Sequence, residues 1–474
     1  MPNPPAQFPS PARNDAATRA EPGAETGAAP WFDVVIFGAG VAGLWTACRL
    51  ADAGFRVLVL ERGEIGQGQT IGSQGIIHGG IKYALTGEAS RASAAIARMP
   101  EVWRRCLQGE GEIDLSGVLT LSPEQYLWTT PGIASRLAGL GASKVIRTPV
   151  EKVPSDQPPP APLLVGAPRG GVLGVGGIDV YRVAEPVLET HSIVMALTVA
   201  SRARGVAIIH APRVSLVQPE SREPAGGWRV EVARAGAPDP IAIPCRAVVF
   251  CAGEQNEGLA RGAGLIGPDD RIMQLRPLHM AIARNAPGPL FGHCLGSGTT
   301  PRLTITAFPC DALPGPGATT WGWSIGGEIA ESGVGRSEAE QIAAVRDELA
   351  SCLKWLDLSG LRLATIRWNR AEGLTPDGVR PDEPVVRNLA PPGNGPALVA
   401  WPTKLAFAPE LAGRVEAALR GLGCTPGALA NHRNTADARP GAGAHSAEAQ
   451  LVAAGLEAAR VCPPLWQRSG LQWR

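Results

Sequence analysis

Blocks of apolar residues near the start of the chain predict a strand, a helix and a second strand. Residues Val34–Glu61 read VVIFGAGVAGLWTACRLADAGFRVLVLE. The run Val34–Phe37 is short and apolar throughout, which is typical of a strand buried on both faces. A glycine-rich turn and a helical stretch follow, and a second apolar strand, Val57–Leu60, ends on the acid Glu61. The pattern predicts a β–α–β unit with a parallel pair of strands.

The remaining elements follow from the same kind of pattern. Residues 115–177 alternate short apolar runs with Pro/Gly turns, which we interpret as an insertion. An α/β pattern returns after residue 177, and residues 271–330 are again rich in predicted strands. We expect helices at Ala89–Leu107, Val183–Arg204, Glu338–Leu356 and from near Pro409, and strands at Val206–His210, Val214–Val217, Ala247–Cys251, Leu363–Trp368 and Ala397–Trp401.

These elements predict an α/β protein in which a Rossmann-like domain is interrupted by a β-rich domain. We assign residues 31–100, 177–268 and 360–425 to the Rossmann-like, nucleotide-binding domain. Residues 101–176 and 269–359 form the second domain, which we expect to hold the substrate. Residues 1–30 are predicted to be a disordered leader rich in Pro, Ala and Gly, and residues 426–474 a C-terminal helix and tail.

Composition excludes several classes of function. The net charge is +1 and 18% of the residues are charged, so we expect no nucleic-acid partner. Nine cysteines without a CxxC pair or metal-ligand spacing indicate a reducing compartment and no metal site. The leader has no apolar signal core, and the best uncharged apolar run, Ser192–Ser201, is too short to span a membrane. We expect a cytoplasmic protein without a transmembrane segment; Trp466 and Trp473 leave peripheral membrane contact open, although packing is the simpler role for them.

The glycines of the first turn carry the clearest chemical signal. Gly38-x-Gly40-x-x-Gly43 stands between the first strand and its helix, which is the setting of a dinucleotide fingerprint. Gly38 permits the tight turn, Gly40 lets the backbone approach a pyrophosphate, and Gly43 lets helix and strand pack closely. The pyrophosphate is expected at the helix N-terminus. Glu61, followed by Arg62, is placed to accept hydrogen bonds from ribose hydroxyls and disfavours a 2′-phosphate.

The number of fingerprints bears on which dinucleotide is bound. An enzyme that uses both a flavin and NAD(P)H needs a second glycine fingerprint, and the other candidate, Gly171–Gly177, follows no strand that leads into a helix. A nicotinamide enzyme normally keeps its Rossmann half contiguous, whereas this one is interrupted twice. Both observations favour FAD alone, reduced directly by an organic substrate.

Several segments now carry a family resemblance that spans most of residues 32–420. Together with Val34–Glu61, the loop 63–83 and the segments 205–217, 248–253 and 397–412 resemble the FAD-dependent D-amino-acid-oxidase-like superfamily, with its glutathione-reductase-2-like architecture. Ile77–Tyr83 (IHGGIKY) resembles the VHGGIRY segment of FAD-dependent glycerol-3-phosphate dehydrogenases and the IHxGIYY segment of L-2-hydroxyglutarate oxidases, with Lys82 in place of Arg. Trp401–Leu405 (WPTKL) resembles the GGKLTTYR segment of the first group with both glycines replaced.

The resemblance implies positions for the cofactor. The loop that carries Ser73, Gln74 and His78 is expected beside the isoalloxazine ring, and a covalent histidyl link stays open. Lys404 and the N-terminus of the helix that starts near Pro409 are expected to place positive charge near flavin N1 and the C2 carbonyl, and Leu405 is expected to contact the cofactor beside them. Two further segments complete the expected FAD site, with Val214 against adenine and the backbone of Ala252 and Gly253 near the pyrophosphate.

Oxidation by FAD moves a hydride from substrate carbon to flavin N5, and it requires a base for the released proton. His279 is the first candidate, because Leu275–Ala283 resembles a strand that carries a substrate-site His in the glycerol-3-phosphate enzymes; His78 is the second. An alternating strand puts His279 opposite Leu278 and Met280. Candidate clamps for an anionic substrate are Lys82, Tyr83, Arg302 and Arg370.

The leading hypothesis is an FAD-dependent dehydrogenase or oxidase acting on CH–OH or CH–NH groups of a small anionic substrate. Two alternatives stay open: a flavin enzyme for a larger substrate, such as a modified nucleoside or a protein-bound amine, and a flavin-binding protein without turnover. The electron acceptor, which oxygen, a quinone or a carrier protein could be, is also left open by the sequence.

Overall fold

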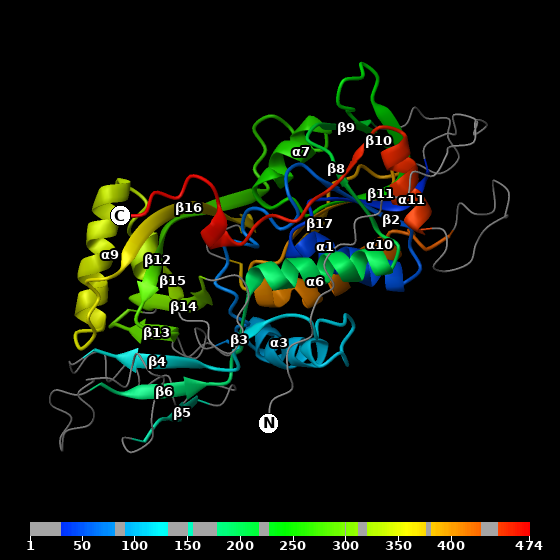
Figure 1. Ribbon diagram of the computed structural model, residues 1–474. Helices are drawn as coiled ribbons and strands as arrows, with labels where there is room; N and C mark the ends of the chain where they lie inside the picture. The colour runs from blue at the N-terminus through cyan, green and yellow to red at the C-terminus, as the bar shows by residue number, and fades with distance from the viewer. Residues whose placement is uncertain are drawn as a thin grey trace, which may run out of the picture.

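A computed structural model describes residues 30–80, 91–130, 150–154, 178–217, 227–298, 300–310, 320–375, 381–427 and 444–474. The described residues form two large β-sheets that lie side by side, each with its own helices (Figure 1). The predicted leader and the glycine-rich segment at 171–177 lie outside the described residues.

The first sheet has a parallel centre in the order β18-β11-β1-β2-β8. All six residues of β1 are buried, because the strand has neighbours on both sides and is covered on both faces. The five strands are β1 (Phe32–Phe37), β2 (Val57–Glu61), β8 (Ala207–His210), β11 (Ile241–Phe250) and β18 (Ala397–Trp401), and antiparallel β17 (Val385–Asn388) and β19 (Glu457–Ala458) close the edges. The predicted β–α–β unit is confirmed.

Alternate residues of β1 enter two different cores. Val34 and Ile36 pack with α1 (Val41–Asp52), α3 (Arg91–Leu107), α6 (Thr190–Ala203) and α10 (Ala408–Gly421). Val35 and Phe37 pack on the other face, under the strands β9 (Val214–Val217) and β10 (Trp228–Val232) and the helices α7 (Asn256–Gly262) and α11 (Ala444–Ala453). Figure 1 shows these two layers on opposite faces of the sheet.

The second sheet is largely antiparallel, in the order β16-β12-β15-β14-β13-β4-β6-β5. Its longest pair, β12 (Met273–Ala286) and β16 (Arg362–Gly373), runs from this sheet to the first, where β16 contacts the short helix η1 (Gly253–Gln255). The helix α9 (Glu338–Cys352) begins with a capping box made by Ser337 and Glu340 and packs against the sheet. The other strands are β15 (Trp321–Gly326), β14 (Leu303–Pro309), β13 (Phe291–Leu295), β4 (Gln125–Thr129), β6 (Val180–Val183) and β5 (Val150–Lys152).

The fold class agrees with the prediction, but several boundaries differ. Strands β6 and β16 belong to the second sheet, although their residues were assigned to the nucleotide-binding domain. Conversely, Trp103 and Cys106 of α3 pack in the core of the first sheet. Helix α6 begins at Thr190 rather than at residue 183, because Glu189 caps its first amides and Val187–Leu188 form strand β7 with β3 (Thr120–Ser122). Local patterns identify an element but not the sheet it joins.

The C-terminal tail connects the two halves (Figure 1). After β19, the amide of Cys462 donates to Ile65 O, and further on Arg474 and Leu363 exchange backbone hydrogen bonds. Trp466 stacks on Phe308 at 4.6 Å between ring centroids. These contacts give the tail a packing role. No helix among the described residues is both long and apolar enough to cross a bilayer.

Candidate functional site

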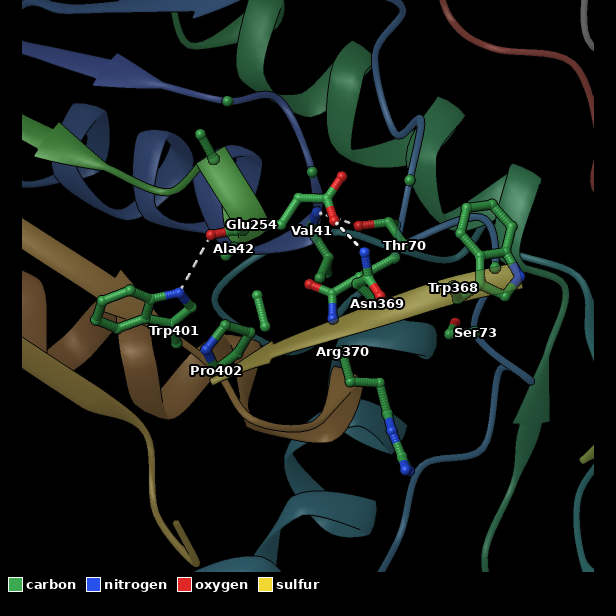
Figure 2. A pocket seen from close by; sticks show the side chains of 18 of the residues that line it. Val41, Ala42, Thr70, Ser73, Glu254, Trp368, Asn369, Arg370, Trp401 and Pro402 are labelled. Carbon is green, nitrogen blue, oxygen red and sulfur yellow. Dashed lines mark hydrogen bonds between the residues drawn. The ribbon is translucent and has the colours of Figure 1, made fainter. Parts of the chain in front are cut away.

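A cavity of about 1180 Å³ opens at the carboxyl ends of β1, β2 and β11 and extends between the two sheets. One end is lined by the glycine turn and the start of α1, and the other by residues of β12, β13 and β16. Figure 2 shows this arrangement, with Val41 and Ala42 of α1 facing Trp368, Asn369 and Arg370 of β16. The carboxyl edge of a parallel sheet is where open α/β folds bind their ligands.

The three fingerprint glycines occupy positions that exclude larger residues. Gly38 has φ of 100°, and a β-carbon there would lie 2.7 Å from the carbonyl oxygen of Cys251. At Gly43 a β-carbon would lie only 1.9 Å from Gly38 O, and at Gly40 it would approach Thr70 Oγ1 at 3.0 Å. The turn and the helix therefore pack closely, as the fingerprint predicts.

The N-terminus of α1 faces the cavity. The Val41 amide donates to Thr70 Oγ1 at 3.0 Å, and Gly40 offers no side chain to cap the helix. Amides and the helix dipole at this end favour an anion.

Glu61 stands at the end of β2, on the wall of the cavity. One carboxylate oxygen accepts the Ala39 amide at 2.7 Å and the other accepts the Gly63 amide at 2.8 Å. These bonds fix the carboxylate beside the glycine turn. Its neighbour Arg62 also lines the cavity and donates to Gln255 Oε1 at 3.2 Å.

The other residues predicted to contact the cofactor all line the same cavity: Ser73, Gln74, His78, Val214, Ala252, Gly253, Lys404 and Leu405. Gln74 donates to the carbonyl oxygens of Thr304 and Ser324 in the second sheet, at 2.9 and 3.1 Å. The carbonyl of Gly253 accepts the indole N–H of Trp401 at 3.2 Å. These residues thus come from both sheets and meet around one space.

Several features of this space fit FAD. The three glycines form a cradle that a β-carbon would obstruct, next to the N-terminus of a helix. The hydroxyl oxygen of Ser73 is buried and has no hydrogen-bond partner among the described residues. A buried polar atom of this kind is normally satisfied by a ligand or by water. We therefore expect the glycine turn and Glu61 to hold the adenosine diphosphate part, with Ser73, His78 and Lys404 toward the flavin.

Thr403 differs from the corresponding residue of the family segment that it resembles, and its backbone conformation shows the difference. Thr403 has φ of 61°, a conformation that favours glycine, and it stands where that segment has a glycine. Its hydroxyl donates to the Pro402 carbonyl at 2.6 Å. The following residue, Lys404, lies over the Phe407 ring with Nζ 5.7 Å from the centroid. The backbone at Thr403 is therefore strained, and this residue lines the cavity.

His279 does not reach the cavity, contrary to its prediction as the first candidate base. Its neighbours Leu278 and Met280 are among the described lining residues, and His279 is not. The side chain is 1% exposed and its Nδ1 bonds the Gly333 carbonyl at 3.0 Å. Burial lowers the pKa of this imidazole. The predicted alternation was right, but the face that carries His279 packs against the segment before α9.

The four residues predicted to bind an anionic substrate do not form one group in the structure. Arg302 pairs with Glu348 of α9 at 2.7 and 3.0 Å, and it is not among the described residues of the cavity wall, so its role as a clamp is contradicted. Arg370 does line the cavity, and its Nη2 donates to Glu331 Oε1 at 2.9 Å. Figure 2 shows Arg370 and Asn369 pointing in opposite directions from β16. Lys82 and Tyr83 lie outside the described residues.

Two ionisable residues beside His78 were missed. His293 lines it from β13, and its Nδ1 bonds Thr304 Oγ1 at 2.8 Å. Glu185 is fully buried and lies 3.4 Å from Nδ1 of His78. A histidine inside the apolar strand Phe291–Leu295 was a signal that could have been noticed. Glu185, in a connection between two short strands, gave none.

Comparison with known proteins agrees with this geometry. A family model described as FAD dependent oxidoreductase matches residues 33–401. The chain is 40% identical over 396 residues to a probable FAD-dependent oxidoreductase of Pseudomonas aeruginosa, covering 83% of this chain and 92% of that protein. The crystal structure of an FAD-dependent oxidoreductase from the same organism gives a TM-score of 0.68 at 34% identity, covering 93% of this chain and 98% of the other.

Two more distant structures share the fold. An iminodiacetate oxidase of Chelativorans sp. BNC1 gives a TM-score of 0.56 at 14% identity, covering 85% of this chain and 99% of that chain. A glycine oxidase of Geobacillus kaustophilus gives 0.55 at 17% identity, covering 86% and 99%.

Proposed function

Because the chain belongs to the family of FAD-dependent oxidoreductases, with FAD as its cofactor, we propose that it oxidises a small amine that carries a carboxylate, such as an amino or imino acid. When bound, FAD accepts the hydride that leaves the substrate carbon. The protein has to bind the substrate, orient its C–H bond and take up the proton from nitrogen.

The position and the unsatisfied Nε of Arg370 are the main support for this proposal. Its Nη2 is bound to Glu331, but its Nε is buried and has no hydrogen-bond partner in the described part of the chain. A guanidinium presents paired N–H groups that match a carboxylate. Glu331, which also lines the cavity, supplies a negative group for a substrate ammonium. The two side chains together are complementary to a zwitterion.

The structural neighbours support an amine rather than an alcohol, since two of them are named for the oxidation of glycine and of iminodiacetate. The narrower resemblance to glycerol-3-phosphate dehydrogenases and L-2-hydroxyglutarate oxidases has weaker support: a glycerophosphate oxidase of Mycoplasma pneumoniae shares the fold, but more of the similar structures are named for amino or imino acids. A hydroxyl-bearing anion therefore becomes an outcome of the test.

His78 is the proton acceptor in this proposal. Of the two bases predicted, it alone lines the cavity, and its side chain is 38% exposed. Oxidation of an amine by loss of hydride leaves a proton on nitrogen, and an imidazole within reach can accept it.

The test is anaerobic bleaching of the visible flavin absorption by a panel of substrates. Glycine, sarcosine, iminodiacetate and other amino acids form the first arm, and 2-hydroxy acids with glycerol 3-phosphate form the second. We expect bleaching in the first arm. Bleaching in the second arm alone would overturn the amine assignment, and no bleaching in either would overturn the proposed activity.

Substitution of Arg370 tests the clamp. Arg370→Ala should lower kcat/KM by about 10- to 100-fold, because a charge-assisted hydrogen bond contributes roughly 1.5–3 kcal/mol. Arg370→Lys keeps the charge but loses the paired donors, so a smaller loss is expected. The matched control is Arg302→Lys, which changes an arginine paired with Glu348 away from the cavity. Equal losses from Arg370→Lys and Arg302→Lys would contradict the clamp.

A further inference from the structure

Glu185 is a fully buried carboxylate with donors from two parts of the chain, residues 78–79 and Gln125, beside it. The Gly79 amide donates to its Oε1, and Gln125 Nε2 of β4 donates to its Oε2 at 3.3 Å. The same Oε2 lies 3.4 Å from Nδ1 of His78. A carboxylate buried with this many donors is held in one orientation, because a buried charge requires hydrogen-bond partners.

The position of the carboxylate bears on which nitrogen of His78 carries the proton. A negative oxygen beside Nδ1 favours the tautomer with the proton on Nδ1. The lone pair is then on Nε2, the nitrogen that can accept a proton from a ligand. His78 itself lines the cavity, whereas Glu185 lies behind it.

His293 completes the surroundings of His78. The two rings stack with centroids 6.3 Å apart and planes inclined by 26°. Burial, followed by the proximity of His78, lowers the pKa of His293 to about 4, so this ring is neutral near pH 7. In the described part of the chain, Glu185 and His293 are the ionisable groups placed against His78. Among the described residues, a protonated His78 would therefore face the negative Glu185 and the neutral ring of His293.

We propose that Glu185 is a positioning residue for the proposed amine oxidation: it holds Nδ1–H of His78 and leaves Nε2 free to take the substrate proton. This inference rests on the proposed function. The substrate loses a hydride to FAD and its N–H proton to Nε2 of His78, and the C–N bond becomes a C=N bond. The resulting imidazolium is stabilised by the carboxylate of Glu185, and the pair is then neutral overall.

The first test needs no substrate. Nitrogen-15 NMR of histidine-labelled holoenzyme, with His78 assigned by its loss in His78→Gln, reports which ring nitrogen is protonated. The wild-type protein should show the Nδ1–H tautomer of His78. In Glu185→Leu that tautomer should lose its preference, and Glu348→Gln, a carboxylate paired with Arg302 away from the cavity, should leave the signal unchanged. A wild-type signal from the Nε2–H tautomer of His78 would overturn the inference even if Glu185→Leu does not fold.

The second test uses whichever panel compound bleaches the flavin. Glu185→Gln keeps the size of the side chain and removes its charge, so bleaching should slow by at least about 10- to 100-fold, the loss found when a residue that orients a metal-bound imidazole is changed. The acid limb of the pH profile should move to lower pH, because loss of the negative charge disfavours the imidazolium. Glu185→Asp, which keeps the charge, should recover part of the rate.

The two proposals fail separately. If no compound bleaches the flavin, the proposed function falls, and the NMR result still decides whether Glu185 sets the tautomer. If a compound bleaches the flavin and the pH profile of Glu185→Gln superposes on that of the wild type, the positioning role of Glu185 falls and the proposed function stands.

Discussion

The two ends of the cavity are built in different ways. At the glycine turn, Gly38, Gly43 and Glu61 lie within one stretch of chain, and Glu61 reaches back only 22 residues to the Ala39 amide. At the other end, Gly79 meets Glu185 across 106 residues, and Gln74 meets Ser324 across 250. The first end is specified by a local sequence, and the second by how two sheets dock. Local motifs can therefore identify the cofactor, whereas the substrate groups depend on tertiary packing.

The largest effect is expected from a substitution in the glycine turn, at the end of the cavity that a local sequence specifies. In Gly43→Ala the new β-carbon would fall 1.9 Å from Gly38 O, so either the helix or the turn must move. We expect loss of bound FAD and destabilisation by about 3 kcal/mol. The ratio of flavin to protein absorbance after purification and the urea midpoint measure both. Gly421→Ala, at the end of α10 with no atom within 4 Å of the new β-carbon, is the matched control and should keep its FAD.

The difference between the two ends of the cavity also explains which parts of the site could be predicted from the sequence. The fingerprint glycines, Glu61 and the parallel pair β1 and β2 follow from one contiguous pattern, Val34–Glu61. The alternation along β12 was also predicted correctly, but the side of the strand that meets the cavity depends on where α9 packs. His279 was therefore placed on the wrong side. Arg302 was misassigned for a similar reason, since its partner Glu348 lies 46 residues further on.

The pH dependence of the unfolding free energy tests the burial of His293, at the end of the cavity that depends on tertiary packing. His293 has a pKa of about 4 in the folded protein against 6.5 ordinarily, so the unfolded chain binds a proton that the folded one excludes. Its contribution to stability is complete above pH 6.5 and is lost as the pH falls toward 4, by about 3 kcal/mol in total. His293→Gln should flatten this part of the unfolding free energy against pH. His191→Gln, on α6 away from the cavity, should not; an equal slope in wild type and His293→Gln would contradict the burial argument.

His279→Ala is expected to lower the stability of the protein by a smaller amount and to leave the reaction nearly unchanged. The substitution removes a buried ring and its hydrogen bond to Gly333, so we expect destabilisation by about 1–3 kcal/mol in urea unfolding. The rate of flavin bleaching at saturating substrate should stay within about twofold of the wild-type rate, whereas loss of a general base slows such a step by about 10²–10⁴-fold. A loss of that size would return His279 to the reaction.

The smallest effect is expected at Thr403, in the wall of the cavity. A threonine with φ of 61° is strained by roughly 1–2 kcal/mol, and glycine removes this strain but adds freedom to the unfolded chain. Thr403→Gly should therefore stabilise the protein by about 0.5–1 kcal/mol. Asn285, with φ of 58°, is the matched control, because asparagine tolerates this conformation and Asn285→Gly should gain less. If Thr403→Gly gains stability but binds FAD more weakly, the strain holds Lys404 and Leu405 in place for the cofactor. Unchanged FAD affinity would mean that the turn is set by the local chain alone, as at the glycine fingerprint.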